Sequence, residues 1–327
     1  MNKKSLTKGL FYIFINNFTN LNELNYSLCY NNIVMKIEDG IFKRDKYEVF
    51  YRLVGDFKED SIPLVILHGG PGGNFSSYEV LYQLADKGIP LLLYNQHGSY
   101  KSTIYNEKDY DELFTIESYM EELEAILAYL NIKKYHLLGH SWGGMLALQY
   151  ILDKKDKNMQ SLILFSTLPS SKLWGIENLR LIRYYPKKTR EEIIKNKDDG
   201  SYTSLLLKRG IKKFMKEHNG DKSRRVYINK EKKVKFLGKS YQHMWGKSEI
   251  VSDGTLKDWD VTDRLKEIKI RTLIISGQED ESTPYINKVM NDEIPNSKWV
   301  LLRDSQHCGY VQEPELVINT LINWIKK

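Results

Sequence analysis

The sequence of 327 residues predicts an α/β fold, in which a mostly parallel, doubly wound sheet carries an inserted helical cap. Three observations predict this class. Short buried-strand patterns alternate with amphipathic helix patterns over residues 63–165, and the alternation resumes after residue 270. A strand, a glycine-flanked turn and a helix follow one another directly at residues 135–152. Between the two alternating regions, separate helical patterns occupy roughly residues 170–250.

These patterns divide the chain into three parts. Residues 31–169 and 251–327 form the predicted α/β core, and residues 170–250 form the predicted helical cap. Residues 1–30 are expected to be a poorly ordered N-terminal extension. Lysines precede a short apolar run there, as in a secretory signal, but Asn16 and Asn17 end the run and no small-residue cleavage site follows.

Composition narrows the setting in which the protein works. The two cysteines, Cys29 and Cys308, are too few for a disulfide framework, and neither has the spacing of a metal ligand. We therefore expect a reducing, cytoplasmic location and no metal or other cofactor. No stretch approaches the roughly 20 apolar residues that a membrane helix needs, so stable membrane insertion is not expected.

Charge is unevenly distributed along the chain. Residues 171–250 hold 22 basic and 9 acidic residues, a charge of +13, which leaves −6 for the rest of a chain whose net charge is +7. A basic cap is compatible with nucleic-acid binding, but no aromatic-interleaved basic motif of a nucleic-acid module is present. A solvated surface is the favoured interpretation, and no nucleic-acid partner is expected.

The elements are predicted in order as follows. Residues 33–37 and 47–53 form antiparallel strands joined by a turn at residues 38–40, and buried strands follow at residues 63–67 and 89–94. Thr115 is the expected N-cap of a helix that precedes the strand ending at residue 138. The remaining expectations are strands at residues 161–165, 270–276 and 299–302, cap helices at residues 178–185, 203–216 and 234–245, and helices at residues 285–290 and 314–325.

The glycine-flanked turn has the pattern of a nucleophile elbow. Residues 139–144 are Gly-His-Ser-Trp-Gly-Gly, so Ser141 lies at the centre of a Gly-x-Ser-x-Gly motif between a strand and a helix. Gly139 and Gly143 lack the Cβ atoms that would collide in so tight a turn. A structural serine in a glycine-rich turn is the alternative, so the remaining catalytic groups decide between the two.

A second glycine-rich loop is a candidate oxyanion hole. Residues 68–73 are His-Gly-Gly-Pro-Gly-Gly and follow a buried strand directly. A phosphate-binding loop is disfavoured, because neither a Gly-Lys-Ser/Thr ending nor a Gly-x-Gly-x-x-Gly fingerprint is present. In α/β hydrolases this loop and the residue after the nucleophile each supply one N–H, which indicates Gly70 and Trp142.

A serine nucleophile needs a base, and the base needs an acid. Of seven histidines, His307 follows the last strand and precedes the last helix, where an α/β-hydrolase histidine belongs; the others lie in strands, turns or the cap. Asp280 follows a buried strand and is the expected acid. The alternatives are its neighbours Glu279 and Glu281 and the aspartates of the preceding segment, Asp253, Asp258, Asp260 and Asp263. The order Ser141, Asp280, His307 is the α/β-hydrolase order.

Together these motifs resemble the proline iminopeptidase family of serine aminopeptidases. The resemblance rests on residues 68–73 and 139–144, on Gly-x-x-Asp-x-x-x-Pro at residues 277–284 and on Ser-x-His at residues 305–307. The segment Gly-Thr-Leu-Lys-Asp-Trp-Asp at residues 254–260 is also similar to the tricorn-interacting-factor branch. Two departures stand at residues 95–102, where Asn95 replaces a family aspartate and Tyr100 a family glycine.

The resemblance implies release of the N-terminal residue, proline or another, from short peptides with a free N-terminus. Ser141 would attack the carbonyl, His307 would transfer the proton, and Asp280 would orient His307. Glu249 aligns with the cap glutamate that grips the substrate ammonium, although a solvated surface glutamate is nearly as good an interpretation. A carboxylesterase, lactonase or amidase with the same triad is the enzymatic alternative, and a non-catalytic binding protein is an alternative of another class.

Overall fold

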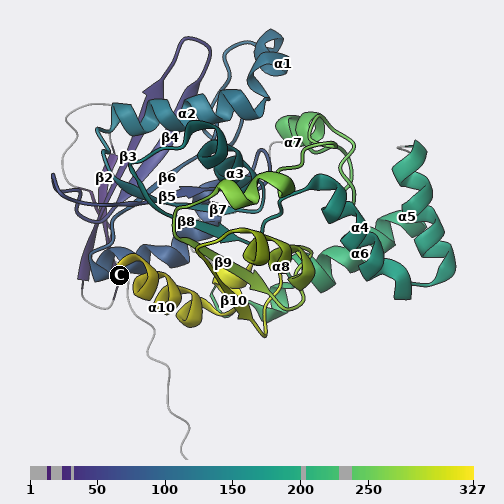
Figure 1. Cartoon of the computed structure of the whole chain (residues 1–327). Helices are drawn as coiled ribbons and strands as arrows, with labels where there is room; N and C mark the ends of the chain where they lie inside the picture. Colours follow the sequence, from purple (N-terminus) through teal and green to yellow (C-terminus); the bar gives the residue numbers. More distant parts are fainter. Residues whose placement is uncertain (1–12, 16–23, 31–32, 200–203, 228–237) are drawn as a thin grey trace, which may run out of the picture.

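A computed structural model of the chain describes residues 13–15, 24–30, 33–199, 204–227 and 238–327 (Figure 1). Its strands form one ten-stranded sheet in the order β1-β2-β3-β4-β6-β5-β7-β8-β9-β10. Strands β1 to β4 are antiparallel to their neighbours, whereas all pairs from β6 to β10 are parallel. The strands are β1 Ile13–Ile15, β2 Leu24–Tyr30, β3 Ile33–Lys43, β4 Glu48–Val54, β5 Leu64–Leu67, β6 Leu91–Tyr94, β7 Tyr135–His140, β8 Met159–Phe165, β9 Thr272–Gly277 and β10 Ser297–Leu302.

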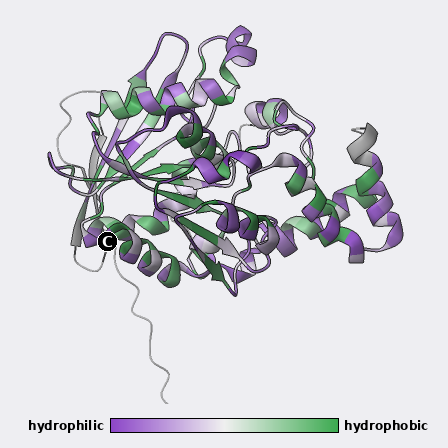
Figure 2. Cartoon of the chain, in the orientation of Figure 1, coloured by the Kyte–Doolittle hydropathy of each residue, from purple (hydrophilic) through white to green (hydrophobic). Residues whose placement is uncertain are grey.

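Helices cover both faces of this sheet, as the alternation of the sequence predicts (Figure 1). One face packs against α2 (Ile116–Tyr129), α3 (Trp142–Lys154) and α8 (Pro284–Glu293), and the other against η1 (Phe75–Lys87) and α10 (Pro314–Ile325). Strand β5 shows why two cores result: Val65 and Leu67 join the first, Leu64 and Ile66 the second. The central strands are hydrophobic along their length because both of their faces are buried (Figure 2).

The predicted turn at residues 38–40 is wrong, because strand β3 runs through it to Lys43. Asp39 forms a buried ion pair with Arg52 of β4, with Oδ1 accepting from Nε at 2.6 Å. Gly40 is needed for a different reason from the one expected: a Cβ at this position would lie 2.3 Å from the ring of Tyr51 on the neighbouring strand. Here glycine makes room for an aromatic ring and does not mark a turn.

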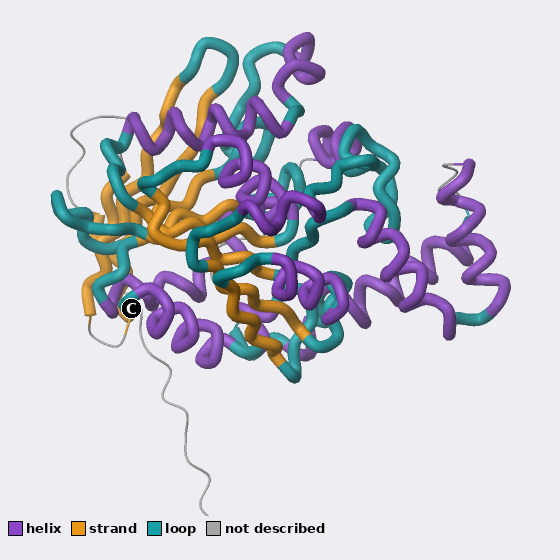
Figure 3. The backbone as a smooth tube through the Cα atoms, in the orientation of Figure 1, coloured by secondary structure: helices purple, strands orange, loops and turns teal. Residues whose placement is uncertain are grey.

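The cap contains α4 (Ser171–Leu181), η3 (Ile182–Tyr184), α5 (Lys187–Asp199), α6 (Leu205–Phe214), the π-helical turn η4 (Met215–Asn219), η5 (Lys222–Arg224) and α7 (Gly238–Met244). Helices α5 and α6 project from the body at the right of the view (Figure 3). Helix α5 was not among the sequence predictions, because its charged sequence offers few apolar residues besides the buried Ile193. Of the helix expected at residues 234–245, residues 234–237 lie outside the described residues.

We propose on this basis that residues 170–250 act as a cap on a core formed by residues 31–169 and 251–327. Ile182, Ile193, Leu207 and Phe214 form a small apolar cluster of the cap's own. Of the predicted N-terminal extension, Ile13–Ile15 and Leu24–Tyr30 are strands at the edge of the sheet, and residues 1–12 and 16–23 lie outside the described residues. Within the ranges described, no helix is both long and apolar enough to cross a membrane.

Candidate active site

Ser141 lies in a strained turn between β7 and α3, with φ 56° and ψ −122°. Its flanking glycines are required by space. A Cβ on Gly139 would lie 2.3 Å from the carbonyl oxygen of Gly143, and a Cβ on Gly143 would lie 2.2 Å from the carbonyl oxygen of Leu67. The Ser141 N–H donates to the Phe165 carbonyl at 3.0 Å, which holds the turn against the neighbouring strand.

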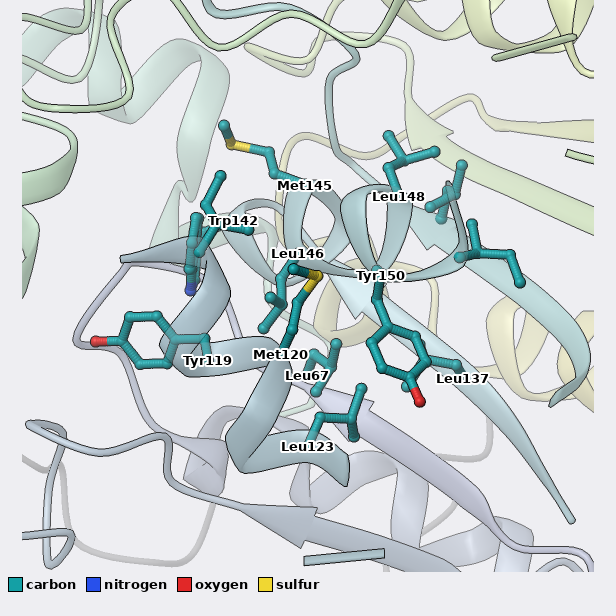
Figure 4. Close-up of a cluster of buried hydrophobic side chains, with 14 of the residues drawn as sticks. Leu67, Tyr119, Met120, Leu123, Leu137, Trp142, Met145, Leu146, Leu148 and Tyr150 are labelled. Atoms are coloured by element: carbon teal, nitrogen blue, oxygen red, sulfur yellow. The ribbon is translucent and has the colours of Figure 1, made fainter. Parts of the chain in front are cut away.

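The helix that follows the serine is anchored by apolar packing. Trp142, Met145, Leu146 and Leu148 of α3 point into a cluster that they share with residues of β5, β7 and α2, labelled in Figure 4. Trp142 is 1% exposed, and its ring meets that of Tyr119 edge-on with 5.6 Å between the centroids. Because the helix cannot shift without opening this cluster, the strain at Ser141 is held in place.

His307 and Asp280 meet at the carboxyl ends of neighbouring strands. Asp280 follows β9, and His307 lies between β10 and the short helix α9 (Gly309–Gln312). The His307 Nδ1–H donates to Asp280 Oδ1 at 2.8 Å. The same oxygen accepts the N–H of Ser282 at 2.8 Å, so the carboxylate is oriented by its own loop. This arrangement leaves His307 Nε2 available on the other side of the ring.

Ser141 and His307 line one cavity of about 540 Å³, together with the glycine loop and residues of the cap. The structure therefore brings the predicted nucleophile, base and one oxyanion residue, Gly70, to a single site. The predicted substrate-binding residue Glu249 lines the same cavity. The volume is in the range of pockets for small ligands and is large enough for a short peptide.

Two carboxylates face His307 in addition to Asp280. Glu281 Oε1 lies 3.7 Å from His307 Nε2 and accepts from Asn219 Nδ2 at 2.5 Å. Among the described residues, the buried Glu281 Oε2 has no hydrogen-bond partner. Glu249 Oε2 accepts from the Tyr241 hydroxyl at 2.5 Å. The sequence offered Glu281 only as an alternative acid, and its place beside Glu249 could not be foreseen without the cap.

Burial and mutual repulsion control the charges of this group. Burial raises the pKa of Glu249, and burial together with the charge of Glu249 raises the pKa of Glu281 well above its usual range. Burial by itself lowers the pKa of His307, but the carboxylates of Asp280, Glu281 and Glu249 outweigh that effect and raise it to about 9. The two glutamates therefore favour their neutral forms in the empty site, and a cation entering beside them would favour their ionised forms.

The candidate oxyanion donors are oriented by hydrogen bonds of their neighbours. His68 Nε2 accepts the N–H of Gln96 at 3.0 Å, so the neutral ring carries its proton on Nδ1 and donates to the Gly69 carbonyl at 2.8 Å. Because the C=O and N–H of a trans peptide point in opposite directions, this bond also aims the N–H of Gly70. Trp142 is the first residue of α3, so its N–H has no acceptor within the helix.

The cap holds both catalytic loops. The carbonyl oxygen of His218, in η4, accepts the N–H of Glu281 at 3.1 Å and the N–H of His307 at 3.3 Å. Gln306 Nε2 donates to the carbonyls of Lys216 and Glu217 at 2.8 and 2.6 Å. The turn from Met215 to Asn219 is thus attached to the acid loop and the histidine loop at once. Within the parts of the chain described, no cluster of three or more His, Cys, Asp or Glu residues could hold a metal ion.

Comparisons with known proteins identify the family of the chain. The family model described as alpha/beta hydrolase fold matches residues 62–314. The proline iminopeptidase of Lactobacillus helveticus (strain DPC 4571) is 38% identical over 292 residues, which cover 89% of this chain and 98% of that protein. The proline iminopeptidase of Clostridioides difficile is 37% identical over 292 residues, with coverages of 89% and 99%.

Two solved structures are similar to this chain over most of its length. VinJ is similar with a TM-score of 0.78 and 26% identity, over 88% of this chain and 98% of that one. The proline iminopeptidase of Mycobacterium smegmatis is similar with a TM-score of 0.76 and 25% identity, over 88% and 97% of the two chains.

Proposed function

Because the chain belongs to the proline iminopeptidase family of α/β hydrolases and is a serine aminopeptidase, we propose that Ser141, His307 and Asp280 are its catalytic triad. Short peptides with a free N-terminus are its proposed substrates, and the cytoplasm is its proposed location. The observation that carries the proposal is one cavity lined by a strained serine, an aspartate-paired histidine and Glu249, with the buried Glu281 3.7 Å from the histidine. Assignment to the tricorn-interacting-factor branch stays a prediction.

The chemistry follows from the positions of the protons. His307 Nδ1–H is held by Asp280, so Nε2 accepts the proton of the Ser141 hydroxyl as the oxygen attacks the carbonyl carbon of the first residue. The N–H groups of Gly70 and Trp142 hold the oxyanion, which is worth about 3 to 4 kcal/mol per donor. His307 then gives its proton to the departing amine, and water releases the acyl group by the same steps in reverse.

Recognition of the N-terminus falls to Glu249 and Glu281. An N-terminal proline carries a secondary ammonium with two N–H donors, and the two glutamates supply one carboxylate for each. A primary ammonium has three donors and is compatible with the same pair, so proline is favoured and other residues are not excluded. The unpartnered Glu281 Oε2 supports this role, because a buried acceptor without a donor costs about 1 to 3 kcal/mol until a ligand supplies one.

Substrate binding also prepares the base. In the free enzyme, the surrounding carboxylates raise the pKa of His307 to about 9, which keeps the ring protonated at neutral pH. An ammonium bound between Glu249 and Glu281 neutralises two of those carboxylates. The pKa of His307 should therefore fall when a substrate with a free N-terminus binds, and the neutral base becomes available. A substrate without an ammonium lacks this advantage.

A panel of aminoacyl-7-amido-4-methylcoumarins tests the proposal. Proline and several other residues would be presented with free and with acetylated N-termini, to the native protein and to Ser141→Ala. Turnover of free-amine substrates that depends on Ser141 is the expected result, and the panel ranks the side-chain preference. Equal turnover of acetylated substrates, or hydrolysis of p-nitrophenyl esters alone, would favour an esterase and remove Glu249 and Glu281 from the proposed site.

A further inference from the structure

His140, the residue before the nucleophile, is buried in the elbow and bonds to two other parts of the site. Its Nε2 lies 3.1 Å from the carbonyl oxygen of His307, and its Nδ1 lies 2.8 Å from the hydroxyl of Tyr78 on η1. The Tyr78 oxygen in turn accepts the N–H of Gly69 at 3.1 Å. His140 is 5% exposed and Tyr78 is 2% exposed. Neither residue belongs to the triad or to the proposed oxyanion hole.

The chemistry of the bonded groups fixes which one donates and which one accepts in each of these hydrogen bonds. A carbonyl oxygen only accepts, so His140 Nε2 carries the proton that it shares with the His307 carbonyl. Burial first, and then the charge of His307, lowers the pKa of His140 well below its usual value, so the ring is neutral and Nδ1 has no proton. Tyr78 must therefore donate to Nδ1. Burial raises the pKa of Tyr78, so its hydroxyl keeps that proton.

These hydrogen bonds connect three segments of the site that must keep a fixed spacing. Gly69 lies in the glycine loop next to Gly70, His140 adjoins Ser141, and the last acceptor is the backbone of His307. Aromatic rings enclose His140: Tyr310 lies edge-on at 5.3 Å between centroids, and Phe165 at 5.7 Å. This packing leaves little room for the imidazole to move, so the bonds on its two sides are coupled through a rigid ring.

We propose that His140 and Tyr78 are positioning residues that hold the glycine loop and His307 at their working distances from Ser141. The proposal rests on the triad and oxyanion roles given above. Catalysis needs His307 Nε2 and the Gly70 N–H to meet the same reacting group, and a displacement of about 1 Å in a catalytic group can cost about 100-fold in rate. His140 and Tyr78 also line the cavity. Loss of one bond between them should therefore lower kcat much more than it changes KM, since a positioning role acts on the reacting geometry.

Tyr78→Phe is the first test, because it keeps the buried ring and removes only the hydroxyl. Tyr82→Phe is the matched control: Tyr82 lies on the same helix, is 4% exposed and accepts from Arg52 through its hydroxyl, away from the cavity. Kinetics on proline 7-amido-4-methylcoumarin should show about a 10- to 100-fold lower kcat for Tyr78→Phe with KM little changed. Tyr82→Phe should keep the kcat of the native protein.

Substitution of His140 separates positioning from packing. The amide of His140→Gln can accept from Tyr78 through its oxygen and donate to the His307 carbonyl through its nitrogen, whereas His140→Leu can do neither. His140→Gln should keep most of the native kcat, whereas His140→Leu should not. Adding Tyr78→Phe to His140→Leu should lower kcat little further, because the bond between the two residues is already lost. Native kcat in Tyr78→Phe, or equal kcat in the two His140 variants, would overturn the proposal; if His140→Leu does not fold, Tyr78→Phe decides. The same series includes Ser141→Ala, whose residual activity, if it stayed high, would instead refute the proposed triad.

Discussion

The two halves of the site are built in different ways. On the core side, Ser141, Asp280 and His307 each follow the carboxyl end of a strand, so the sheet itself brings them together. On the cap side, Asn219 is the last residue of the π-helical turn η4 and Glu249 lies in a loop after α7, and Asn219 is fixed by its bond to Glu281 of the core. We infer from this comparison that the sheet places the proposed triad, whereas the cap completes the proposed ammonium site by bringing Glu249 and Asn219 to Glu281 of the core.

Hydrogen bonds nevertheless make the two halves one unit. The His218 carbonyl in the cap accepts the backbone N–H of both Glu281 and His307, so a cap residue orients the base and a recognition residue together. A cap held in this way limits the space above the serine. The cap bounds the space available to a substrate, because several of its residues line the cavity that holds Ser141, among them Ile211, Met215, Asn219 and Glu249.

The largest expected effect is on the core side. Asp280→Asn should lower kcat by about 10⁴-fold with little change in KM, because the amide favours the wrong tautomer of His307 and cannot stabilise its charged form. Steady-state kinetics on proline 7-amido-4-methylcoumarin measures it. Asp292→Asn, at an exposed aspartate that pairs with Lys288, is the control and should behave as the native protein does. Near-native kcat in Asp280→Asn would assign the acid to another residue.

Variants of the proposed ammonium site, between cap and core, should lose less activity, and only on some substrates. Glu249→Gln and Glu281→Gln should each lower kcat/KM for free-amine substrates by about 30- to 1,000-fold, since one carboxylate of the ammonium site becomes neutral, at about 2 to 4 kcal/mol. Hydrolysis of a p-nitrophenyl acyl ester, which has no ammonium, should change much less. Glu191→Gln, at an exposed glutamate of α5, is the control. Equal losses on both substrates would mean that the glutamates support the fold or the base and do not recognise the amine.

The pH dependence tests how strongly the halves are coupled. Since kcat/KM reports the free enzyme, it should rise with pH through an apparent pKa near 9, where His307 loses its proton. Glu281 is one of the carboxyl groups that raise the pKa of His307, so in Glu281→Gln this pKa should fall and the rising part of the profile should move to lower pH. The kcat profile reports the bound enzyme, so its apparent pKa should be lower than that of the kcat/KM profile. An unchanged profile in Glu281→Gln would place its charge too far from His307 to matter.

Sequence reasoning reached the core side because its geometry is local. Gly139 and Gly143 mark the turn, and the order of the strands places Asp280 and His307 where they support an elbow over a structural serine. The cap side could not be derived in the same way. Which of Glu279 and Glu281 lies beside His307 depends on distant residues: Glu279 pairs with Arg224 at 2.6 Å, whereas the Glu281 side chain is held near His307 by Asn219 of the cap.

Other differences have equally specific causes. Gly40 has the composition of a turn, but its role is to admit the ring of Tyr51 from the next strand, a contact that no short-range pattern encodes. Helix α5 has too few apolar residues for periodicity to indicate it, and its burial depends on packing against α6. In each case the structure of the segment depends on the residue or helix that packs against it, and not on the segment's own sequence.

The smallest expected effect concerns Asn95, where the resembled family has an aspartate. Asn95 Oδ1 accepts the N–H of Phe75 at 3.0 Å, and its Nδ2 donates to the carbonyl of Tyr100. Asn95→Asp keeps the first bond but sets a carboxylate oxygen against the Tyr100 carbonyl, which should lower the free energy of unfolding by about 1 to 3 kcal/mol. Because Asn95 is 1% exposed and outside the cavity, kcat should change less than threefold, a bound that follows from about 0.6 kcal/mol of barrier. Urea denaturation and kinetics on the same preparation measure both quantities. A large loss of kcat with unchanged stability would show that the loop containing Asn95 takes part in catalysis. This loop would then have to be added to the comparison as a third part of the site.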